Sequence, residues 1–231
     1  MNAYRRTATI VGLLYIIGTV AGVLSKVVTA GLLDAPDHLG AVATHASRAQ
    51  WGALFTLVMG VALAMVPAMV FPILRRQNEV LAVGYVIFRG ALETMTYVGV
   101  AMCWLLLAVD ARQYVDAGAD VAAQFSGIGT LLAKAMDPTV AIQDIVVSVG
   151  ALMFYALLYR AGLVPRWLSG WGIVGVIGYL TAGLIAVFST HLVILLIPLA
   201  VQEMVMAVWL IARGFTPGAL APESDRQPVA V

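Results

Sequence analysis

The stretch from Trp51 to Leu74 reads WGALFTLVMGVALAMVPAMVFPIL, contains no charged residue, and is followed directly by Arg75 and Arg76. A helix needs about 20 apolar residues to cross the hydrocarbon core of a bilayer, so this stretch is long enough to span a membrane. Further runs of the same kind complete a set of six: Thr7–Ser25, Trp51–Leu74, Val80–Val109, Val140–Tyr159, Trp171–Ser189 and Leu192–Ala212. The sequence therefore predicts an all-α polytopic membrane protein, with a six-helix transmembrane domain over residues 1–213.

The composition of the whole chain points the same way. Its 231 residues are 62% hydrophobic and 11% charged, whereas charged residues make up about a quarter of soluble domains. A soluble domain of this composition would expose large apolar patches, which cause aggregation. The net charge of +1 supplies no basic face, so we expect membrane lipid and no nucleic acid as a partner.

The charges between the predicted spans predict the orientation. With the N-terminus in the cytoplasm, the inner segments carry Arg5, Arg6, Arg75, Arg76, Arg160, Arg166, Arg213 and Arg226. The outer segments carry Lys26, Arg48, Arg112 and Lys134. Because short cytoplasmic connections are enriched in Lys and Arg, we expect both termini to be cytoplasmic.

Three segments outside the spans have a recognisable character. Asp37 is a suitable N-cap for a short helix running toward Gln50. The outer segment 117–136 has apolar residues at helical spacing, which predicts an amphipathic helix lying on the outer membrane surface or capping the bundle. Residues 214–231 are rich in Pro, Gly and polar residues and predict a disordered cytoplasmic tail.

Small residues on the spans favour close helix packing. Gly18 and Gly22 form a GxxxG pattern on the first span, and in lipid such residues let helix backbones approach each other. The pattern suits packing within one bundle and also between two copies of the chain, so a homo-oligomer stays open.

Four ionisable residues lie inside the predicted spans: Arg89 and Glu93 on the third, Asp144 on the fourth and Glu203 on the sixth. Each costs about 2.5–3.5 kcal/mol near the bilayer centre, so such residues usually face the bundle interior and have partners. Arg89 and Glu93 are four residues apart and can pair along one helix face. With the polar neighbours of these positions, the candidate ligand- or ion-binding residues are Arg89, Glu93, Asp144, Glu203, Gln143, Gln202 and Tyr97.

These buried charges do not balance. One positive and three negative charges leave a formal excess of −2 (1 − 3), and an unpaired buried charge tends to be neutralised. Some carboxylates could hold protons, a cation or cationic ligand could lie among them, or Asp144 could stay wet near the outer interface. In a structural alternative, Arg89 bridges the two glutamates and only locks the helices together.

Missing residues exclude several classes of function. No lysine lies inside a predicted span, which argues against a retinal Schiff base, and no histidine lies mid-span, which argues against a haem between the helices. His38, His45 and His191 fall on the predicted outer side without a fixed ligand spacing, so we expect neither a metal nor a cofactor. An enzyme is the least favoured class, because no nucleophile–base pair is visible.

The turn after the fourth predicted span is the most distinctive local sequence. It reads LYRAGLVPRWL from Leu158 to Leu168 and is followed by Gly170 and Gly172. Two further groups of residues accompany it: Phe88, Arg89 and Glu93 on the third span, and Glu203, Trp209, Leu210, Arg213 and Gly214 on the sixth. Together they resemble the bacterial integral membrane family catalogued as domain of unknown function 4386, over nearly the whole chain. The resemblance implies a multi-pass protein of the bacterial inner membrane, with no established activity.

The sequence leads to two hypotheses for function. The first is a transporter-like protein whose polar core binds a proton, a cation or a small polar solute, with Arg89 setting the charge state of Glu93 or Glu203. The second is a non-catalytic structural or regulatory subunit, in which the same buried charges only fix the packing of the helices.

Overall fold

The computed structural model describes residues 3–117, 119–190 and 192–216, and within them the chain is all-helical, without strands. The elements are α1 (Ala3–Thr29), α2 (His38–Thr44), α3 (Ala46–Leu74), α4 (Glu79–Tyr85), the π-helix η1 (Val86–Leu92), α5 (Glu93–Asp116), α6 (Ala119–Ala161), α7 (Arg166–Phe188), the 3-10 helix η2 (Val193–Leu195) and α8 (Ile197–Ala212). The predicted all-α fold is confirmed. The tail predicted at residues 214–231 lies outside the described residues from 217 onward.

Six helical segments of the described chain are long and apolar enough to cross a membrane: Tyr4–Thr29, Ala46–Leu74, Glu79–Asp116, Gln124–Ala161, Arg166–Phe188 and Val193–Ala212. They confirm the number of spans and their order. Several of them extend well beyond the apolar runs in the sequence, because a helix can continue past the hydrocarbon core. The third segment runs through α4, η1 and α5 without a break.

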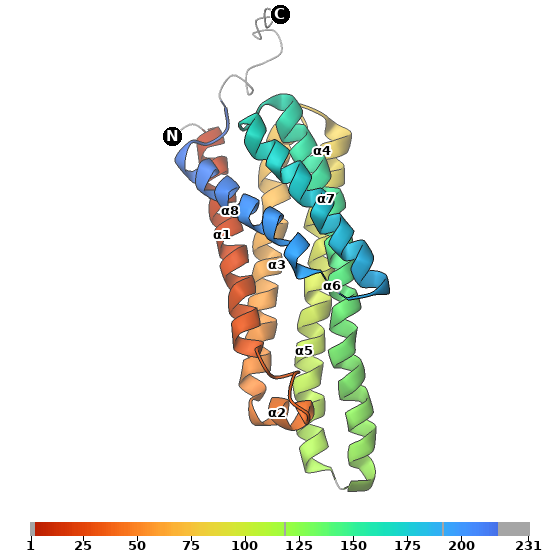
Figure 1. The fold of residues 1–231 in the computed structure, drawn as a ribbon. Coiled ribbons are helices and arrows are strands. Elements are labelled where there is room, and N and C mark those ends of the chain that lie inside the picture. The colour runs from red at the N-terminus through yellow and green to blue at the C-terminus, as the bar shows by residue number, and fades with distance from the viewer. Residues whose placement is uncertain (1–2, 118, 191, 217–231) are drawn as a thin grey trace, which may run out of the picture.

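The helices form an elongated bundle in which sequence neighbours mostly pack against each other (Figure 1). α1 packs along α3, α3 along α5 and α5 along α6, while α7 packs on α6 and α8 returns to α1. The connection between α7 and α8 lies part-way along the bundle (Figure 1). Beyond that level the bundle consists of α2 and the ends of the four longer helices, α1, α3, α5 and α6.

The start of α1 and the end of α8 are joined by Arg5. Its guanidinium donates to the carbonyl oxygens of Ile211 and Ala212, at N–O distances of 2.7 and 3.0 Å. A cationic group at a helix C-terminus is favourable because the last carbonyl groups there have no partner within the helix. Both ends of the transmembrane domain therefore lie at one end of the bundle, called the terminal end below.

The turn from α6 to α7 follows from its glycine and proline. α6 ends at Ala161, Gly162 has a φ of 63°, and the Leu163 N–H donates to the Leu158 carbonyl at 3.2 Å. A glycine in this left-handed conformation is a common way to end a helix. Pro165 stands directly before α7, where its lack of an N–H leaves no donor unsatisfied.

The outer segment 117–136 differs from the expected separate helix. From Ala119 onward it is the first part of α6, which continues through Pro138 to Ala161. Proline inside a helix removes one backbone hydrogen bond, but α6 does not end there. The segment thus lengthens the fourth span and projects past the α7–α8 connection instead of lying across the bundle (Figure 1).

Asp37 caps a short helix, as predicted. Its carboxylate accepts a hydrogen bond from the Gly40 N–H at 2.9 Å at the start of α2. α2 ends at Thr44 and does not reach Gln50, because the chain restarts there as α3 from Ala46.

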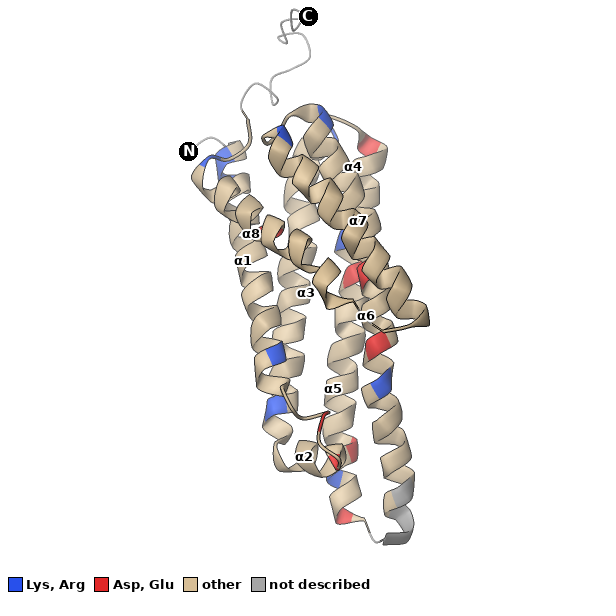
Figure 2. Cartoon of the chain, viewed as in Figure 1, with Lys and Arg blue, Asp and Glu red and all other residues tan. Residues whose placement is uncertain are grey.

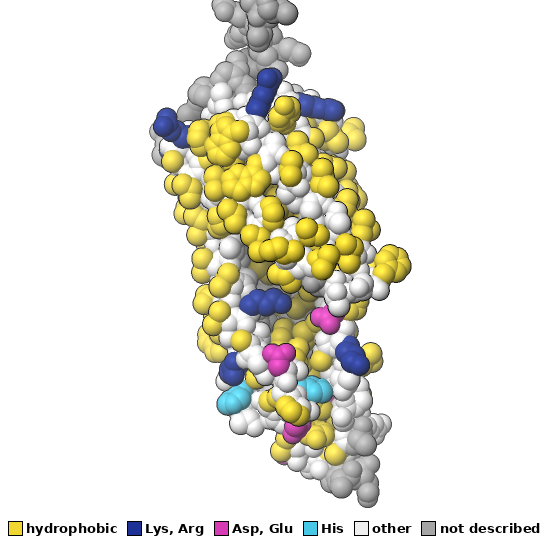
Figure 3. All heavy atoms as spheres, in the orientation of Figure 1, with side chains coloured by type: hydrophobic (Ala, Val, Ile, Leu, Met, Phe, Trp, Pro, Cys, Tyr) yellow, Lys and Arg dark blue, Asp and Glu magenta, His cyan; other side chains and the backbone are white. Residues whose placement is uncertain are grey.

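The distribution of side chains suits a membrane protein. The terminal end carries mostly Lys and Arg, whereas the opposite end carries charges of both signs (Figure 2). Hydrophobic side chains cover the face formed by α7 and α8 (Figure 3). Gly18 and Gly22 of α1 face Leu63 and Met59 of α3, so the GxxxG pattern serves packing within this bundle.

Candidate functional site

A buried arginine joins three helical elements. Arg89 of η1 lies between Glu93 at the start of α5 and Glu203 of α8, and these three residues are called the ion cluster below. Its Nε is 3.1 Å from Glu93 Oε2, and its Nη2 donates to Glu203 Oε1 at 2.9 Å. The side chains are 4%, 1% and 16% exposed, respectively, so the ion cluster lies in the interior.

Arg89 lies in a short stretch where the helix departs from α-helical geometry. Residues 86–92 form a π-helix within an otherwise α-helical span, and such turns occur frequently at functional sites. Arg89 is the buried residue of that turn. The pair with Glu93 keeps the four-residue spacing expected from the sequence, but the contact is ionic: neither Arg89 Nε nor Glu93 Oε2 has a hydrogen-bond partner in the described part of the chain.

Tyr97 continues the ion cluster toward the far end of the bundle. Its hydroxyl donates to Glu93 Oε1 at 2.8 Å, and the ring packs against Gly60 of α3, where an added Cβ would lie 3.0 Å from the Tyr97 Cβ. At the same level, Thr96 Oγ1 donates to Gln143 Oε1 of α6 at 3.3 Å. α5 and α6 are thus joined by polar contacts beside the ion cluster.

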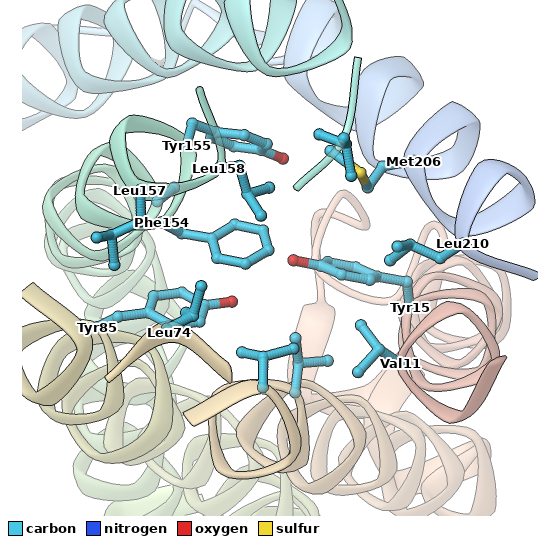
Figure 4. Packing of buried hydrophobic residues seen from close by; sticks show 14 of the residues in the cluster. Val11, Tyr15, Leu74, Tyr85, Phe154, Tyr155, Leu157, Leu158, Met206 and Leu210 are labelled. Carbon is cyan, nitrogen blue, oxygen red and sulfur yellow. The ribbon is translucent and has the colours of Figure 1, made fainter. Parts of the chain in front are cut away.

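On its terminal side the ion cluster is closed by buried aromatic and aliphatic side chains. Tyr15, Tyr85, Phe154 and Tyr155 are each no more than 1% exposed, and Tyr15 and Tyr85 point their hydroxyls toward the same region beside Phe154 (Figure 4). The Tyr85 and Phe154 rings stack with centroids 4.7 Å apart. These four rings are called the aromatic layer below. The layer contacts the ion cluster through Tyr15, because Arg89 lies over the Tyr15 ring at 6.0 Å.

A cavity of about 760 Å³ lies on the other side of Tyr97. Its walls come from α1, α3, α5, α6, α7 and the α7–α8 connection. Lys26, Asp137, Ser189 and Val193 line it and are exposed, so they mark the mouth. The molecular face is hollowed between the apolar surface of α7 and α8 and the α2 end (Figure 3).

The floor of the cavity is polar and buried. Tyr97 is 4% exposed and Asp144 is 1% exposed, and both line the cavity together with Gln143 and Tyr179. Asp144 lies where α6 and α7 approach closely, since a Cβ on Gly183 would be 2.9 Å from the Asp144 Cβ. The cavity therefore leads from the exposed mouth to a buried carboxylate, and Tyr97 connects that floor to the ion cluster.

Comparison with protein families gives one match. The family model described as Domain of unknown function (DUF4386) matches residues 10–214. The chain belongs to this family. No curated protein and no solved structure matches it. The three residues of the ion cluster and the described lining residues of the cavity, from Gly22 to Leu196, all lie within the matched part of this DUF4386 protein.

The structure places the predicted site residues in two groups, except for one residue that lies apart from both. Arg89, Glu93 and Glu203 meet in the ion cluster, while Asp144 and Gln143 line the cavity and Tyr97 belongs to both. Gln202 lies elsewhere: it accepts from the Tyr155 hydroxyl at 2.6 Å and donates to the Leu168 carbonyl at 2.9 Å. It is fully buried between α6, α7 and α8 and lies outside both groups.

Other cavity residues were not foreseen. Lys26 and Asp137 fall just outside the predicted spans, so the sequence alone assigns them to the connections between spans. Tyr179 and Trp104 also line the cavity. Trp104 follows Tyr97 by seven residues and so shares its helix face, whereas the span of Tyr179 is apolar on all sides and its periodicity gives no indication of a face. The only available signal was that an aromatic residue with a polar group, placed mid-span, often needs a partner in the interior.

The histidines do not form a metal centre in the described residues. No group of three or more His, Cys, Asp or Glu side chains there is close enough to hold a metal ion. His38 begins α2 and His45 follows it, whereas His191 lies outside the described residues. The expectation of no metal site stays a prediction for the whole chain.

Proposed function

We propose that this DUF4386 protein is a transporter-like membrane protein that binds a small polar solute or cation in the cavity described above. The single observation that carries this proposal is the cavity itself, open at exposed residues and ending at the buried carboxylate of Asp144. Ligand pockets usually have volumes of about 300–1,000 Å³ and combine apolar walls with a few polar groups. A volume of 760 Å³ with this lining falls within that range.

The cavity is open at one end and closed at the other, which supports a transport role. The cavity opens away from the terminal end, and the aromatic layer closes the terminal side. If the arginine-rich terminal end is cytoplasmic, as the positive-inside rule predicts, the cavity faces outward. A carrier that alternates between two faces needs a central site that is closed on one side at a time.

The charge balance supports a cationic ligand or a proton. The ion cluster carries one positive and two negative formal charges, a sum of −1, and Asp144 adds a further negative charge at the cavity floor. Ionisable groups inside a membrane are expensive and commonly mark ion or substrate pathways. A cation at the floor would lower the electrostatic energy of both groups of charges.

A second candidate function rests on the ion cluster. Arg89 contacts carboxylates from two other elements at once, which is also what a packing lock in a structural or regulatory subunit would do. That reading accounts for Arg89, Glu93 and Glu203, but it gives no reason for a cavity that ends at Asp144.

Thermal unfolding of the full-length protein in detergent separates the two candidates. The series would compare wild type with Asp144→Asn and Glu203→Gln over a range of pH and a panel of inorganic cations and small polar solutes. The exposed Asp116→Asn variant is the matched control. A ligand that binds only the folded state stabilises it by about 2.7 kcal/mol at 100 times its Kd.

For a binding protein, at least one cation or solute raises the unfolding temperature of wild type and Asp116→Asn, and Asp144→Asn abolishes that rise. If no compound raises the unfolding temperature of wild type, and Asp144→Asn and Glu203→Gln are only less stable, the transporter-like function is wrong and the packing lock is supported.

A further inference from the structure

We propose that the ligand of the cavity is an organic monocation: an amine or quaternary ammonium group attached to an apolar body. This inference rests on the proposed function, because it names the chemical class that the same cavity would take. It depends on the size of the cavity, the chemistry of its walls and the sign of its charges.

The cavity is too large for a bare metal ion to be its only ligand. Sodium or potassium would be held by a few oxygen atoms in a small cage, whereas 760 Å³ suits a molecule of many non-hydrogen atoms. Hydrophobic side chains from four different helices form much of the wall, among them Met59, Val100, Val140 and Ala186. A small hydrated solute would make few apolar contacts with this wall.

The charges that line the cavity select a cation. Among the described lining residues, Asp144 at the floor and Asp137 at the mouth oppose Lys26, which gives a formal sum of −1. The carboxylate at the floor is 1% exposed, so water screens its interaction with a ligand only weakly. Lys26, the single cationic side chain in the described lining, is exposed at the mouth and its charge is screened by solvent.

Aromatic rings in the cavity lining favour an ammonium group. Tyr97, Trp104 and Tyr179 line the cavity, and the first two are 4% and 7% exposed. An ammonium group is attracted to the face of a tryptophan or tyrosine ring, and aromatic residues recur in sites for quaternary ammonium ligands. A carboxylate, several aromatic rings and an apolar wall together match a cationic head with an apolar body.

The proposal is tested with three probes that share a body and differ in the charge of the head: 3-phenylpropylamine, 3-phenylpropanol and 3-phenylpropionate. Tetramethylammonium and sodium complete the set. Binding is measured with the full-length protein in detergent, by thermal unfolding and by isothermal titration. Asp144→Asn is compared with the Asp116→Asn control.

The amine is expected to bind saturably and to raise the unfolding temperature, with the alcohol and the carboxylate at least tenfold weaker. Asp144→Asn should weaken the amine about 30-fold or more, since truncating one partner of a buried charge pair has effects of that size. Trp104→Leu should weaken it about 2- to 30-fold. Asp116→Asn should leave its affinity unchanged.

Equal binding of the alcohol and the amine would overturn the inference, as would preference for the carboxylate. Stabilisation by sodium or another inorganic cation alone, lost in Asp144→Asn, would overturn the organic monocation while supporting the proposed function. If none of the probes and no compound of the wider solute panel binds, both the organic monocation and the proposed function are wrong. If Asp144→Asn does not fold, the ranking of the three matched probes on wild type still decides.

Discussion

Arg89 illustrates how a single side chain both stabilises this bundle and depends on it. Taking a guanidinium and two carboxylates out of water is expensive, and their mutual attraction repays the cost only when the geometry is good. Distances of 3.1 and 2.9 Å to Glu93 and Glu203 give close pairing. Removing Arg89 alone would leave two carboxylates in the interior without their counter-charge.

We expect Arg89→Met to lower the free energy of unfolding by about 3–5 kcal/mol, because breaking a buried pair leaves an uncompensated charge. The triple variant Arg89→Met, Glu93→Gln, Glu203→Gln should recover most of that loss, since it removes the charges on both sides. Unfolding by SDS, followed by tryptophan fluorescence, measures both variants. Equal losses in the single and the triple variant would show that the charges are not coupled.

Tyr97 provides a milder test at the same scale. Tyr97→Phe keeps the ring that packs on Gly60 but removes the hydrogen bond to Glu93, which we expect to cost about 1.5–3 kcal/mol, as for hydrogen bonds to charged groups. Tyr159→Phe, at a position that is 42% exposed, is the control and should change stability by less than about 0.5 kcal/mol. The same unfolding assay applies, and similar effects of the two variants would contradict the assigned role of Tyr97.

The sequence predicted part of this site because part of it lies on one helix. Arg89, Glu93 and Tyr97 follow the four-residue spacing of a helix face, so their alignment could be inferred. The contact of Arg89 with Glu203 requires the rotation and depth of α8 relative to η1, which no local pattern encodes. For the same reason, the separation of Asp144 from the ion cluster could not be foreseen.

The elements themselves were easier to predict than their ends. Apolar length placed all the spans, whereas the predicted boundary between the outer segment 117–136 and the fourth span is absent, because α6 runs from Ala119 to Ala161. α6 crosses Pro138 because its 43 residues pack against α5 and α7, and these contacts offset the missing backbone hydrogen bond. A long polar-ended helix and a separate amphipathic helix have the same periodicity, so the sequence could not distinguish them.

The crossing of α7 and α8 depends on one glycine. A Cβ on Gly175 would lie 3.1 Å from both the N and the Cα of Leu199, and backbone atoms cannot move aside without shifting α8. We expect Gly175→Ala to lower the free energy of unfolding by about 1–3 kcal/mol, as overpacked sites do.

Gly127→Ala is the control for this prediction. Nothing lies within 4 Å of a Cβ added there, and alanine is the better helix former, so stability should rise by about 0.5–1 kcal/mol. A neutral Gly175→Ala variant would mean that α7 and α8 are not in close backbone contact.

The whole molecule has two unlike ends, and this asymmetry predicts its orientation. Arginines gather at the terminal end (Figure 2), so we expect that end in the cytoplasm and the cavity mouth outside. In a Cys103→Ala background, Gln113→Cys should react with a membrane-impermeant maleimide in intact cells. Glu79→Cys should react only after the membrane is opened. The reverse labelling would place the cavity mouth in the cytoplasm.

Binding of a small solute or cation in the cavity is tested by the protection of a cysteine on the cavity wall. In the Cys103→Ala background, Ala186→Cys places a thiol at a lining position, and Gln113→Cys serves as a control outside the lining. The rate of alkylation is measured in purified protein with and without each cation and solute, 3-phenylpropylamine included. We predict that at least one compound slows alkylation at position 186 saturably and leaves position 113 unchanged. If no compound slows it, or if both positions are slowed equally, the cavity is not a binding site and the account is contradicted.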